Sequence, residues 1–357
     1  TWEKSRTWEI GLDWGAFNNR LTGSFDYYVR NTKDMVGPAP ELPALLGTAV
    51  PKTNNTDLRT TGWELQIGWR DHLENGLNYG VTFNVSDAQA KVTRYPNNPT
   101  GSLSSYIENR KVGEIWGYET IGIAKTNDEM NQHLATLPNG GQSQLGDKWA
   151  AGDIMYKDLD GDGKISNGSN TLADHGDLKV IGNKTPRYLF GLDLTASWKG
   201  FDFRAFMQGV MKRDYSDARE FLFGATDSGV WWAAGITGVQ DYFRDSETWS
   251  VKNGYESENL NAYLPRPQYS GKNIHTQTRY LLNAAYLRMK NLQIGYTLPQ
   301  SLVSKAGLGN VRFFVSAENL FTITDLPSQF DPETIDTDYG NGYPLSRTFS
   351  FGVNVTL

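Results

Sequence analysis

The segment with the clearest capacity for chemistry is an acidic loop at residues 158–165, which reads Asp-Leu-Asp-Gly-Asp-Gly-Lys-Ile. Its three carboxylates stand at alternate positions, and the glycines at 161 and 163 permit the sharp turns that bring alternate side chains toward one point. Calcium takes six to eight oxygen ligands, which such a loop can supply. We therefore predict a bound calcium ion in a structural role, with magnesium as the less favoured ion.

The predicted ligands follow the first half of an EF-hand or dockerin calcium loop. The twelfth position of such a loop is Ser169 instead of the usual glutamate, so another oxygen must complete the set. Asp174 or Asp177 could supply it, as could Asn167. The simpler alternative is a solvated acidic turn held by side-chain hydrogen bonds to its own backbone. The predicted metal ligands are Asp158, Asp160, Asp162, Lys164 (through its backbone carbonyl) and Asp174.

Aromatic side chains in the stretch 210–284 are the next candidates. Aromatic rings stack on sugars and anchor protein partners. Most of these rings should form a small core within the stretch, but Trp231 and Trp232 cannot both bury against the same layer in an extended segment. We predict substrate or partner contact for this Trp pair. The set is Phe221, Phe223, Trp231, Trp232, Tyr242, Phe243 and Trp249.

Signs of catalysis are weak. The four histidines are scattered without metal-ligand spacing, and no nucleophile elbow, P-loop or dinucleotide fingerprint occurs. Asp331 and Glu333 could form a carboxylate pair of a glycosidase, but Asp331-Pro332-Glu333 reads better as a turn. We predict that the protein is not an enzyme.

The elements that must position these loops are β-strands, because apolar residues alternate with polar ones along most of the chain. One example is Trp8, Ile10, Leu12 and Trp14, and a second is Phe190, Leu192, Leu194 and Ala196. The phase of the alternation shifts near Lys290-Asn291, which predicts a bulge. Nine such strands can be counted, and the weak alternation at 115–124 is expected to lie outside them.

Charges within the strand segments predicted from this alternation occupy only the polar face. A Lys or Arg facing lipid at mid-membrane costs about 2–4 kcal/mol, so a charge-free face suits a membrane wall. The apolar core face of a soluble sandwich would be equally free of charge. Most of the polar-face charges should line the barrel interior or dock a plug. They include Glu9, Asp13, Asp26, Arg30, Glu64, Asp193, Asp202, Arg204, Arg288, Arg312 and Glu318.

Three features favour a membrane barrel over a sandwich. Tyr188 and Trp198 bracket one apolar face at a spacing of about 24 Å along the membrane normal, as two aromatic girdles would. The strands are often longer than the usual five or six residues. Short connections at 18–19, 71–76, 199–200 and 299–310 alternate with long ones near 31–60, 87–186, 210–284 and 321–345. Outer-membrane barrels have short periplasmic turns and long extracellular loops.

Composition excludes other classes. The 357 residues contain 34 basic and 40 acidic side chains, a net charge of −6 that argues against nucleic acid as a partner. There is no cysteine, so disulfides and thiol catalysis are excluded. No apolar run reaches the length of a transmembrane helix. The first residues carry no initiator Met or signal region, so we expect the chain to be part of a longer protein.

Ordered motifs along the whole chain resemble the C-terminal part of the SusC/RagA-type TonB-dependent outer-membrane transporters of Bacteroidetes. The segments that carry the resemblance are LTGSFDYYVRNTKD at 21–34, GDIMYKDLDGDGKI at 152–165, TPRYLFG at 185–191, GFDFRAFMQG at 200–209, YLRMKNLQIGYTLP at 286–299, RFFVSAENLFT at 312–322, Asp331-Pro332-Glu333 and the end of the chain from Tyr343. Many outer-membrane proteins end in an aromatic residue, whereas this chain ends in Leu357.

The resemblance implies an all-β fold, a transmembrane antiparallel β-barrel of 22 strands, of which residues 1–357 would supply about nine. Residues 87–186 and 210–284 would be long extracellular loops. It also implies a plug domain and a TonB-contacting segment, both absent here, and a SusD-like surface lipoprotein as a lid. Function would be the import of oligosaccharide or peptide through a wall that contacts outer-membrane lipid. The alternatives are a soluble secreted β-rich protein that binds or hydrolyses carbohydrate, and a surface receptor without transport.

Overall fold

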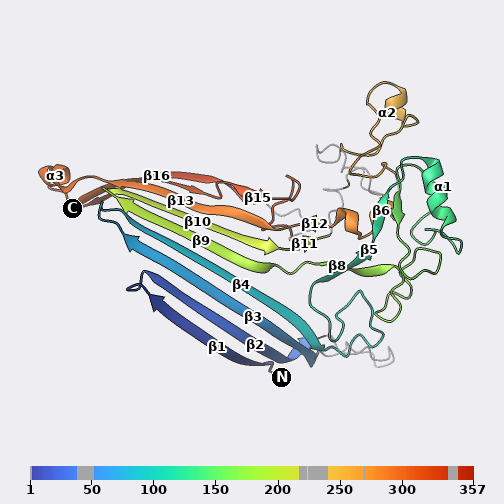
Figure 1. Cartoon of the computed structure of the whole chain (residues 1–357), viewed down its shortest axis with the longest axis horizontal. Helices are drawn as coiled ribbons and strands as arrows, with labels where there is room; N and C mark the ends of the chain where they lie inside the picture. The colour runs from blue at the N-terminus through green and yellow to red at the C-terminus, as the bar shows by residue number, and fades with distance from the viewer. Residues whose placement is uncertain (1, 38–51, 217–222, 224–239, 269, 337–344) are drawn as a thin grey trace.

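A computed structural model describes residues 2–37, 52–216, 223, 240–268, 270–336 and 345–357. Nine long strands form one antiparallel sheet (Figure 1), which confirms the predicted number. In sheet order they are β1 (Lys4–Ala16), β2 (Leu21–Gly37), β3 (Thr53–His72), β4 (Asn78–Arg94), β9 (Arg187–Trp198), β10 (Phe201–Lys212), β13 (Tyr286–Thr297), β14 (Asn310–Glu318) and β16 (Thr348–Thr356). A short strand, β15 (Thr322–Thr324), pairs beside β14 on the end of β13. Within the described residues the sheet does not close, because β1 and β16 each pair on one side only.

Smaller elements lie in the long connections. Three two-stranded ribbons form from β5 (Glu114–Tyr118) with β8 (Leu178–Asn183), β6 (Thr120–Ile123) with β7 (Ile154–Tyr156), and β11 (Asp214–Tyr215) with β12 (Leu282–Asn283). The helices are α1 (Asn127–Ala135), α2 (Trp249–Lys252) and α3 (Gln300–Val303), with 3-10 turns at 271–273, 278–280 and 304–306. The segment 115–124 therefore lies outside the main sheet, as expected. Among the described residues, every helix falls short of the length and apolarity that crossing a membrane requires.

Several strands extend beyond the ends predicted from alternation. The connection expected near 31–60 is only 38–52, because β2 continues to Gly37 and β3 begins at Thr53. The loops expected at 87–186 and 210–284 run instead from 95 to 186 and from 213 to 285. The reason is that hairpin hydrogen bonding persists where both faces of a strand are polar, so alternation marks only the part of a strand with one apolar face.

The predicted bulge is confirmed. The pairing of β10 with β13 shifts between Phe206 and Met207, whose partners are Asn291 and Met289, so Lys290 is the extra residue. A bulge re-aims side chains on its strand. This bulge directs both Arg288 and Lys290 toward the 319–336 connection, where each forms an ion pair described below.

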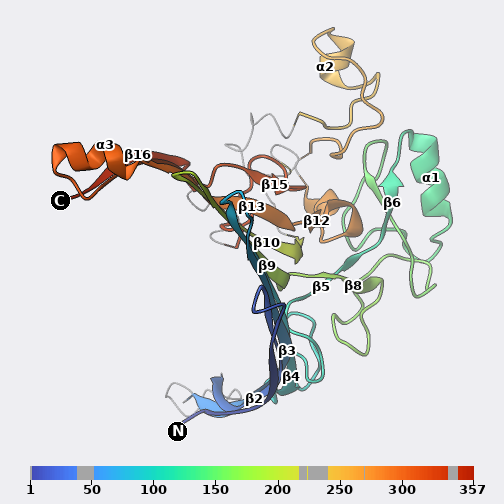
Figure 2. The same ribbon diagram turned by 60° about the vertical axis from the view of Figure 1, so that its left-hand side comes forward.

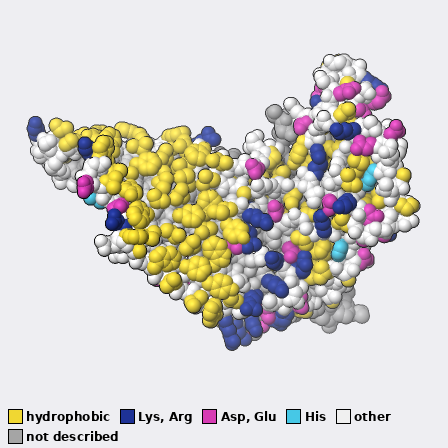
Figure 3. Space-filling view, in the orientation of Figure 1, with side chains coloured by type: hydrophobic (Ala, Val, Ile, Leu, Met, Phe, Trp, Pro, Cys, Tyr) yellow, Lys and Arg dark blue, Asp and Glu magenta, His cyan; other side chains and the backbone are white. Residues whose placement is uncertain are grey.

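The apolar face of the sheet is uncovered. Leu12 is 63% exposed, Ile294 45% and Phe351 71%. Figure 3 shows a continuous apolar surface over the strands, with no second layer of described residues on it. A sandwich requires such a layer. The exposed band therefore distinguishes a membrane wall from a sandwich.

Aromatic side chains gather at both ends of the apolar face. Near the short turns, Phe17 lies 6.1 Å from Trp69 and Phe201 4.5 Å from Tyr296, measured between ring centroids. Near the long connections, Trp8 lies 6.2 Å from Tyr27, and Trp63 lies 6.5 Å from Tyr188. Two girdles of this kind are typical of membrane barrels.

Candidate functional site

The long connections fold together into a body at one end of the sheet (Figures 1 and 2), which we call the loop assembly: residues 95–186, 213–216, 240–285 and 319–336 where described. It contains the largest apolar core in the described structure. Tyr156, Ile165, Leu264 and Ile335, from three different connections, are almost fully buried in one cluster. The assembly is therefore a folded unit and not a set of independent loops.

A buried charge cluster joins two of these connections. The Asp153 carboxylate is fully buried and accepts two hydrogen bonds of 2.8 Å from Arg266, and one of 3.0 Å from the Asn273 amide. The Lys272 ammonium lies 2.8 Å from Asp153, donates to the carbonyl oxygens of residues 147 and 148, and lies 4.7 Å from the centre of the Trp149 ring. Residues more than a hundred positions apart are thus held together.

The protonation of this cluster follows from its contacts. Burial alone would raise the pKa of Asp153, but hydrogen bonds from Arg266, Lys272 and Asn273 outweigh it and leave the pKa below its ordinary value. Burial lowers the pKa of Lys272, against the opposing effect of Asp153. An ionised Asp153 is thus built into the loop assembly.

The acidic loop brings three carboxylates together. Ligand oxygens of Asp158, Asp160 and Asp177 all lie within 4.8 Å of one another. The Asp158 carboxylate accepts hydrogen bonds from the backbone N–H groups of Gly161 and Gly163, and Asp177 accepts from those of Leu159 and Ser166. Burial raises the pKa of Asp177, and the nearby charges of Asp160 and Asp158 add to this. The carboxylate oxygens are therefore held in place by backbone hydrogen bonds, and their negative charges repel one another.

Other predicted ligands are engaged elsewhere. Asp162 pairs with the Lys164 ammonium at 3.1 Å, which lowers the pKa of Asp162. Asp174 accepts hydrogen bonds of 2.9 Å and 2.5 Å from the backbone N–H and hydroxyl of Ser169, which lower its pKa. Of the open alternatives for the missing carboxylate, the structure thus places Asp177 in the cluster and Asp174 outside it.

A pocket of about 390 Å³ opens between the end of β4 and β5. Tyr95 and Tyr106 meet edge to face in its wall at 5.5 Å, and Arg110 lies 5.4 Å from the Trp116 ring while pairing with Glu114 at 2.8 Å. Lys111 and Lys184 also line it. The combination of ring surfaces with cations suits a polar ligand that carries acidic groups.

The most exposed aromatic pair lies on an arm that projects from the loop assembly and carries α2 (Figure 1). Trp249 is 70% exposed and Tyr255 73% exposed, and their rings stack at 5.4 Å with an interplanar angle of 17°. The Asn253 amide donates to the Trp249 carbonyl at 2.7 Å, and the Tyr255 N–H donates to the Ser250 carbonyl at 2.9 Å. The pair is thus held in place while its outer faces remain open to solvent.

The other candidate aromatic residues of the 210–284 stretch agree with the predicted small core where the structure describes them. Phe223 and Phe243 are buried, as the small-core interpretation predicts, and Tyr242 is partly buried with its hydroxyl donating to Glu256 at 2.6 Å. Phe221, Trp231 and Trp232 lie outside the described residues.

The polar face of the sheet carries paired charges. Arg204 lies 2.7 Å from Asp193, and Arg312 donates to Asp202 at 2.8 Å. Where the bulge occurs, the almost fully buried Arg288 lies 2.7 Å from Asp331, and Lys290 lies 2.9 Å from Glu333. Asp331 and Glu333 therefore neutralise two cations of β13, and these ion pairs hold the 319–336 connection on the interior face of the sheet.

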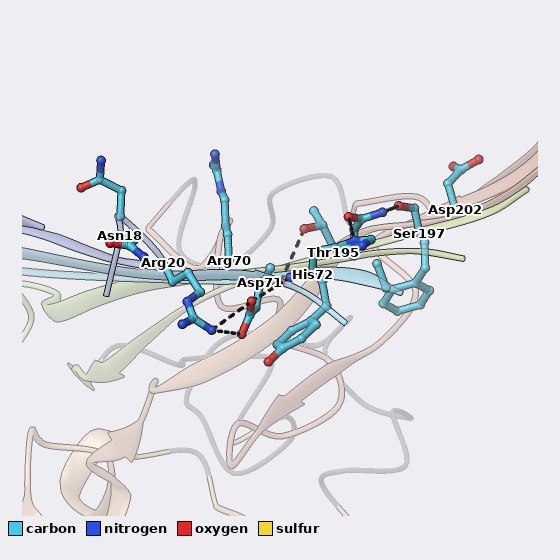
Figure 4. A pocket seen from close by; sticks show the side chains of 14 residues that line it. Asn18, Arg20, Arg70, Asp71, His72, Thr195, Ser197 and Asp202 are labelled. Atoms are coloured by element: carbon cyan, nitrogen blue, oxygen red, sulfur yellow. Dashed lines mark hydrogen bonds and ion pairs between the residues drawn. The ribbon is translucent and has the colours of Figure 1, made fainter. Parts of the chain in front are cut away.

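A hollow of about 650 Å³ lies at the short-turn end (Figure 4). Arg70, Thr195 and Asp202 project from one side of the sheet, whereas Arg20 and Asp71 pair at 3.1 Å on the other side. At the edge of the hollow, the Nδ1 atom of His72 donates to the Asn78 amide oxygen at 2.7 Å. The hollow is open and polar, as expected for a surface that meets water or another protein part.

Comparison with known proteins decides the family. Residues 1–320 match the family described as TonB dependent receptor-like, beta-barrel. The chain belongs to this family. TonB-dependent receptor P3 of Formosa agariphila is 30% identical over 99% of this chain and 34% of its own length. TonB-dependent receptor SusC of Bacteroides thetaiotaomicron is 24% identical over 99% of this chain and 32% of its own length.

Solved structures show the same fold. The structure of the RagAB peptide transporter matches all of this chain and 36% of its own chain, with a TM-score of 0.65 and 23% identity. The RagAB peptide importer in the "open-open" state matches with a TM-score of 0.67 and 24% identity, over 35% of its own chain. This TonB-dependent receptor chain therefore spans about a third of the length of the relatives it matches.

Family membership sets the orientation of the TonB-dependent receptor wall. The sheet lies in the outer membrane, the short turns face the periplasm and the long connections, with the loop assembly, are extracellular. The apolar face meets lipid and the polar face lines the interior. The soluble secreted alternative is wrong for this chain, because the family is one of outer-membrane transporters and receptors.

Sequence reasoning missed the buried cluster around Asp153 and singled out Trp231 and Trp232 over the exposed pair at 249 and 255. The helix α1 was also missed, although Thr126 caps it by accepting from the Glu129 N–H at 3.1 Å. A capping signal of Thr followed three residues later by Glu was present in the sequence. No comparable local signal marks Asp153, since its partners come from another connection.

Proposed function

We propose that this chain forms wall and extracellular loops of a transporter that imports oligomeric nutrients, with glycans as the main cargo class. The observation that carries the glycan assignment is the stacked, solvent-open pair Trp249 and Tyr255 on the projecting arm. Two flat ring faces that stay exposed in water suit the apolar face of a sugar ring. The pocket lined by Tyr95, Tyr106 and Arg110, with its aromatic rings and cations, would be a second binding site for an oligomer.

The glycan assignment predicts that Trp249→Ala with Tyr255→Ala weakens binding of the imported glycan by about 10–30-fold, because each solvent-open ring face that stacks on a sugar should contribute about 0.7–1 kcal/mol. Binding should be measured by calorimetry on the purified full-length receptor, with glycans drawn from those that support growth. Trp249→Tyr is the matched control and should retain most of the affinity, since it keeps a ring face. Equal affinity of all three proteins would contradict the assignment.

The transport assignment has its own test. Deleting the full gene should abolish growth on one class of oligomer. Loss of growth on peptides alone would replace glycan with peptide as the cargo, since the structurally similar RagAB is a peptide transporter. Unchanged growth on every oligomer would leave a surface receptor without transport.

We propose two partners that act with the whole receptor. A SusD-like surface lipoprotein would cover the extracellular loop assembly, and TonB would act through the N-terminal part of the receptor. The lid would open to admit cargo, and a TonB-driven movement of the plug would release it inward. Co-purification of the lipoprotein with the receptor, and its loss when the loop assembly is deleted, would test the first partner.

We also propose that the acidic loop binds calcium and that Asp158, Asp160 and Asp177 supply carboxylate ligands. Their oxygens lie close enough for one cation. The ion would stabilise the connection between β4 and β9, since calcium favours clustered oxygens and is available outside the cell.

The calcium proposal predicts that Asp160→Asn with Asp177→Asn removes bound metal, measured by elemental analysis of the dialysed receptor, and makes residues 158–177 sensitive to protease. Asp174→Asn is the matched control, because Asp174 is satisfied by Ser169 and lies outside the cluster. Metal retained by the double variant would disprove the site. If the Asp174→Asn control loses metal to the same extent, Asp174 is also a metal ligand.

A further inference from the structure

The lipid-facing side of the sheet carries cations at its extracellular edge. Arg6 of β1 pairs in register with Asn31 of β2, Asn31 with Arg59 of β3, and Arg59 with Lys91 of β4. Directly opposed residues on neighbouring strands point to the same face. Two positions further out, Lys4 opposes Lys33. We call Arg6, Lys33, Arg59 and Lys91 the basic row.

The face of the basic row follows from alternation. Arg6 shares its side of β1 with Trp8, Ile10 and Leu12, and Arg59 shares its side of β3 with Trp63 and Leu65. These apolar side chains face lipid. The basic row therefore points away from the interior through which cargo would pass.

The cations of the basic row are available. All four side chains are exposed. Of the carboxylates nearby, Asp34 pairs with Lys4 and with Arg94, and Asp57 also pairs with Arg94. Within the described residues, none of the four cations of the basic row forms an ion pair. A local excess of positive charge is thus left on an otherwise acidic protein.

The depth of the basic row points to its partner. Arg6 lies two residues beyond Trp8, and Arg59 four residues beyond Trp63, which corresponds to about 5–10 Å along the membrane normal beyond the aromatic side chains. Figure 3 shows dark-blue Lys and Arg side chains gathered along the edge of the apolar band on the side of the loop assembly. This is the level of lipid headgroups, next to the girdle.

We propose that the basic row binds the phosphate groups of an anionic outer-leaflet lipid. The apolar band below it would hold the acyl chains of the same molecule, and Asn31 would donate a hydrogen bond between the charges. This lipid site is separate from the cargo sites of the proposed function, because it lies on the opposite face of the sheet.

The test uses the full receptor in nanodiscs of a zwitterionic lipid, with bisphosphorylated lipid A as the probe and native mass spectrometry to count bound lipid. Arg59→Gln with Lys91→Gln should weaken lipid A binding about thirtyfold, the ratio that corresponds to about 1 kcal/mol for each cation. The matched control is Arg30→Gln with Arg70→Gln, which removes the same charge from the interior face and should leave binding unchanged. Arg59→Lys with Lys91→Arg should also bind as the parent does.

Several outcomes would overturn the lipid site. They are equal binding by the Gln double variant and the parent, an equal loss in the interior control, or equal binding of dephosphorylated lipid A. Displacement of lipid A by inorganic phosphate would show a free-anion site and would likewise refute it. Heat-modifiable gel mobility confirms that each variant is folded, so that a binding loss is not mistaken for a folding defect.

Discussion

Replacing Asp153 with Ala is expected to open the extracellular loop assembly while leaving the membrane sheet intact. The change strands the almost fully buried Lys272 ammonium and the Arg266 guanidinium without their carboxylate. Breaking a buried ion pair by removing one partner costs about 3–5 kcal/mol. Hydrogen exchange should therefore show faster exchange at residues 147–156 and 266–273, with unchanged protection in β9 and β10.

A matched control exists in the same assembly. Glu119 pairs with Lys157 at 3.0 Å and also with Lys179, but these ammonium groups are about half exposed. Exposed ion pairs contribute little to stability. Glu119→Ala should therefore leave exchange nearly unchanged. If both variants exchange alike, the buried cluster does not hold the two connections together.

The same cluster predicts an acid limit for the loop assembly. The pKa of Asp153 is lowered from 3.8 in the folded protein, so its stabilising contribution is fully present above pH 3.8 and is lost as the pH falls through the lower folded value. Protease resistance of the 147–156 segment should thus persist at pH 5 and fail only below pH 3.8. Asp153→Ala should remove this transition, and its persistence in the variant would assign it to other groups.

A charge in the apolar band is expected to have the second large effect. Leu194 lies on the lipid-facing side of β9, midway between Tyr188 and Trp198. Leu194→Arg should destabilise the folded receptor in lipid by about 2–4 kcal/mol, since an arginine at the membrane midplane cannot be hydrated. Denaturant titration of the receptor refolded into bilayers measures this change.

Thr195→Arg is the neighbouring control. Thr195 is exposed on the polar face at nearly the same depth, where it lines the hollow shown in Figure 4. An arginine there meets water, so its effect should be small. Equal destabilisation by the two substitutions would mean that the two faces of β9 are not solvated differently.

The strands could be predicted from the sequence because the polarity of each residue matches the solvent, lipid or water, on its face of the sheet. Residues such as Ile10 and Leu12 alternate with Glu9 and Asp13 since lipid and water lie on opposite faces, and this two-residue period needs no distant partner. The bulge at Lys290 was visible for the same reason, as a break in the period. The strand ends were not, because above the membrane β2 and β3 carry mostly polar side chains on both faces and the alternation is lost.

The loop assembly could not be predicted in the same way. Asp153 meets Arg266 across more than a hundred residues, and Tyr156 donates to the Lys272 carbonyl over a similar separation. Such contacts leave no local period. The acidic loop is an intermediate case. The spacing of Asp158 and Asp160 indicated that their carboxylates lie close together. Which of Asp174 and Asp177 joins them could not be predicted, because it depends on the path by which the chain folds back toward residues 158–160.

Solvation of one face of the sheet by hydrocarbon is the property on which the assignment of this chain as a membrane wall depends most. A photoreactive probe confined to the acyl-chain region of the bilayer tests it directly on Phe190, Leu192 and Leu194 of β9, with Asp193 and Thr195 as polar-face positions. We expect single cysteines at the first three positions to be labelled and those at the other two to be protected. Protection of Phe190, Leu192 and Leu194, as a second protein layer would produce, would contradict the assignment of this face to the membrane.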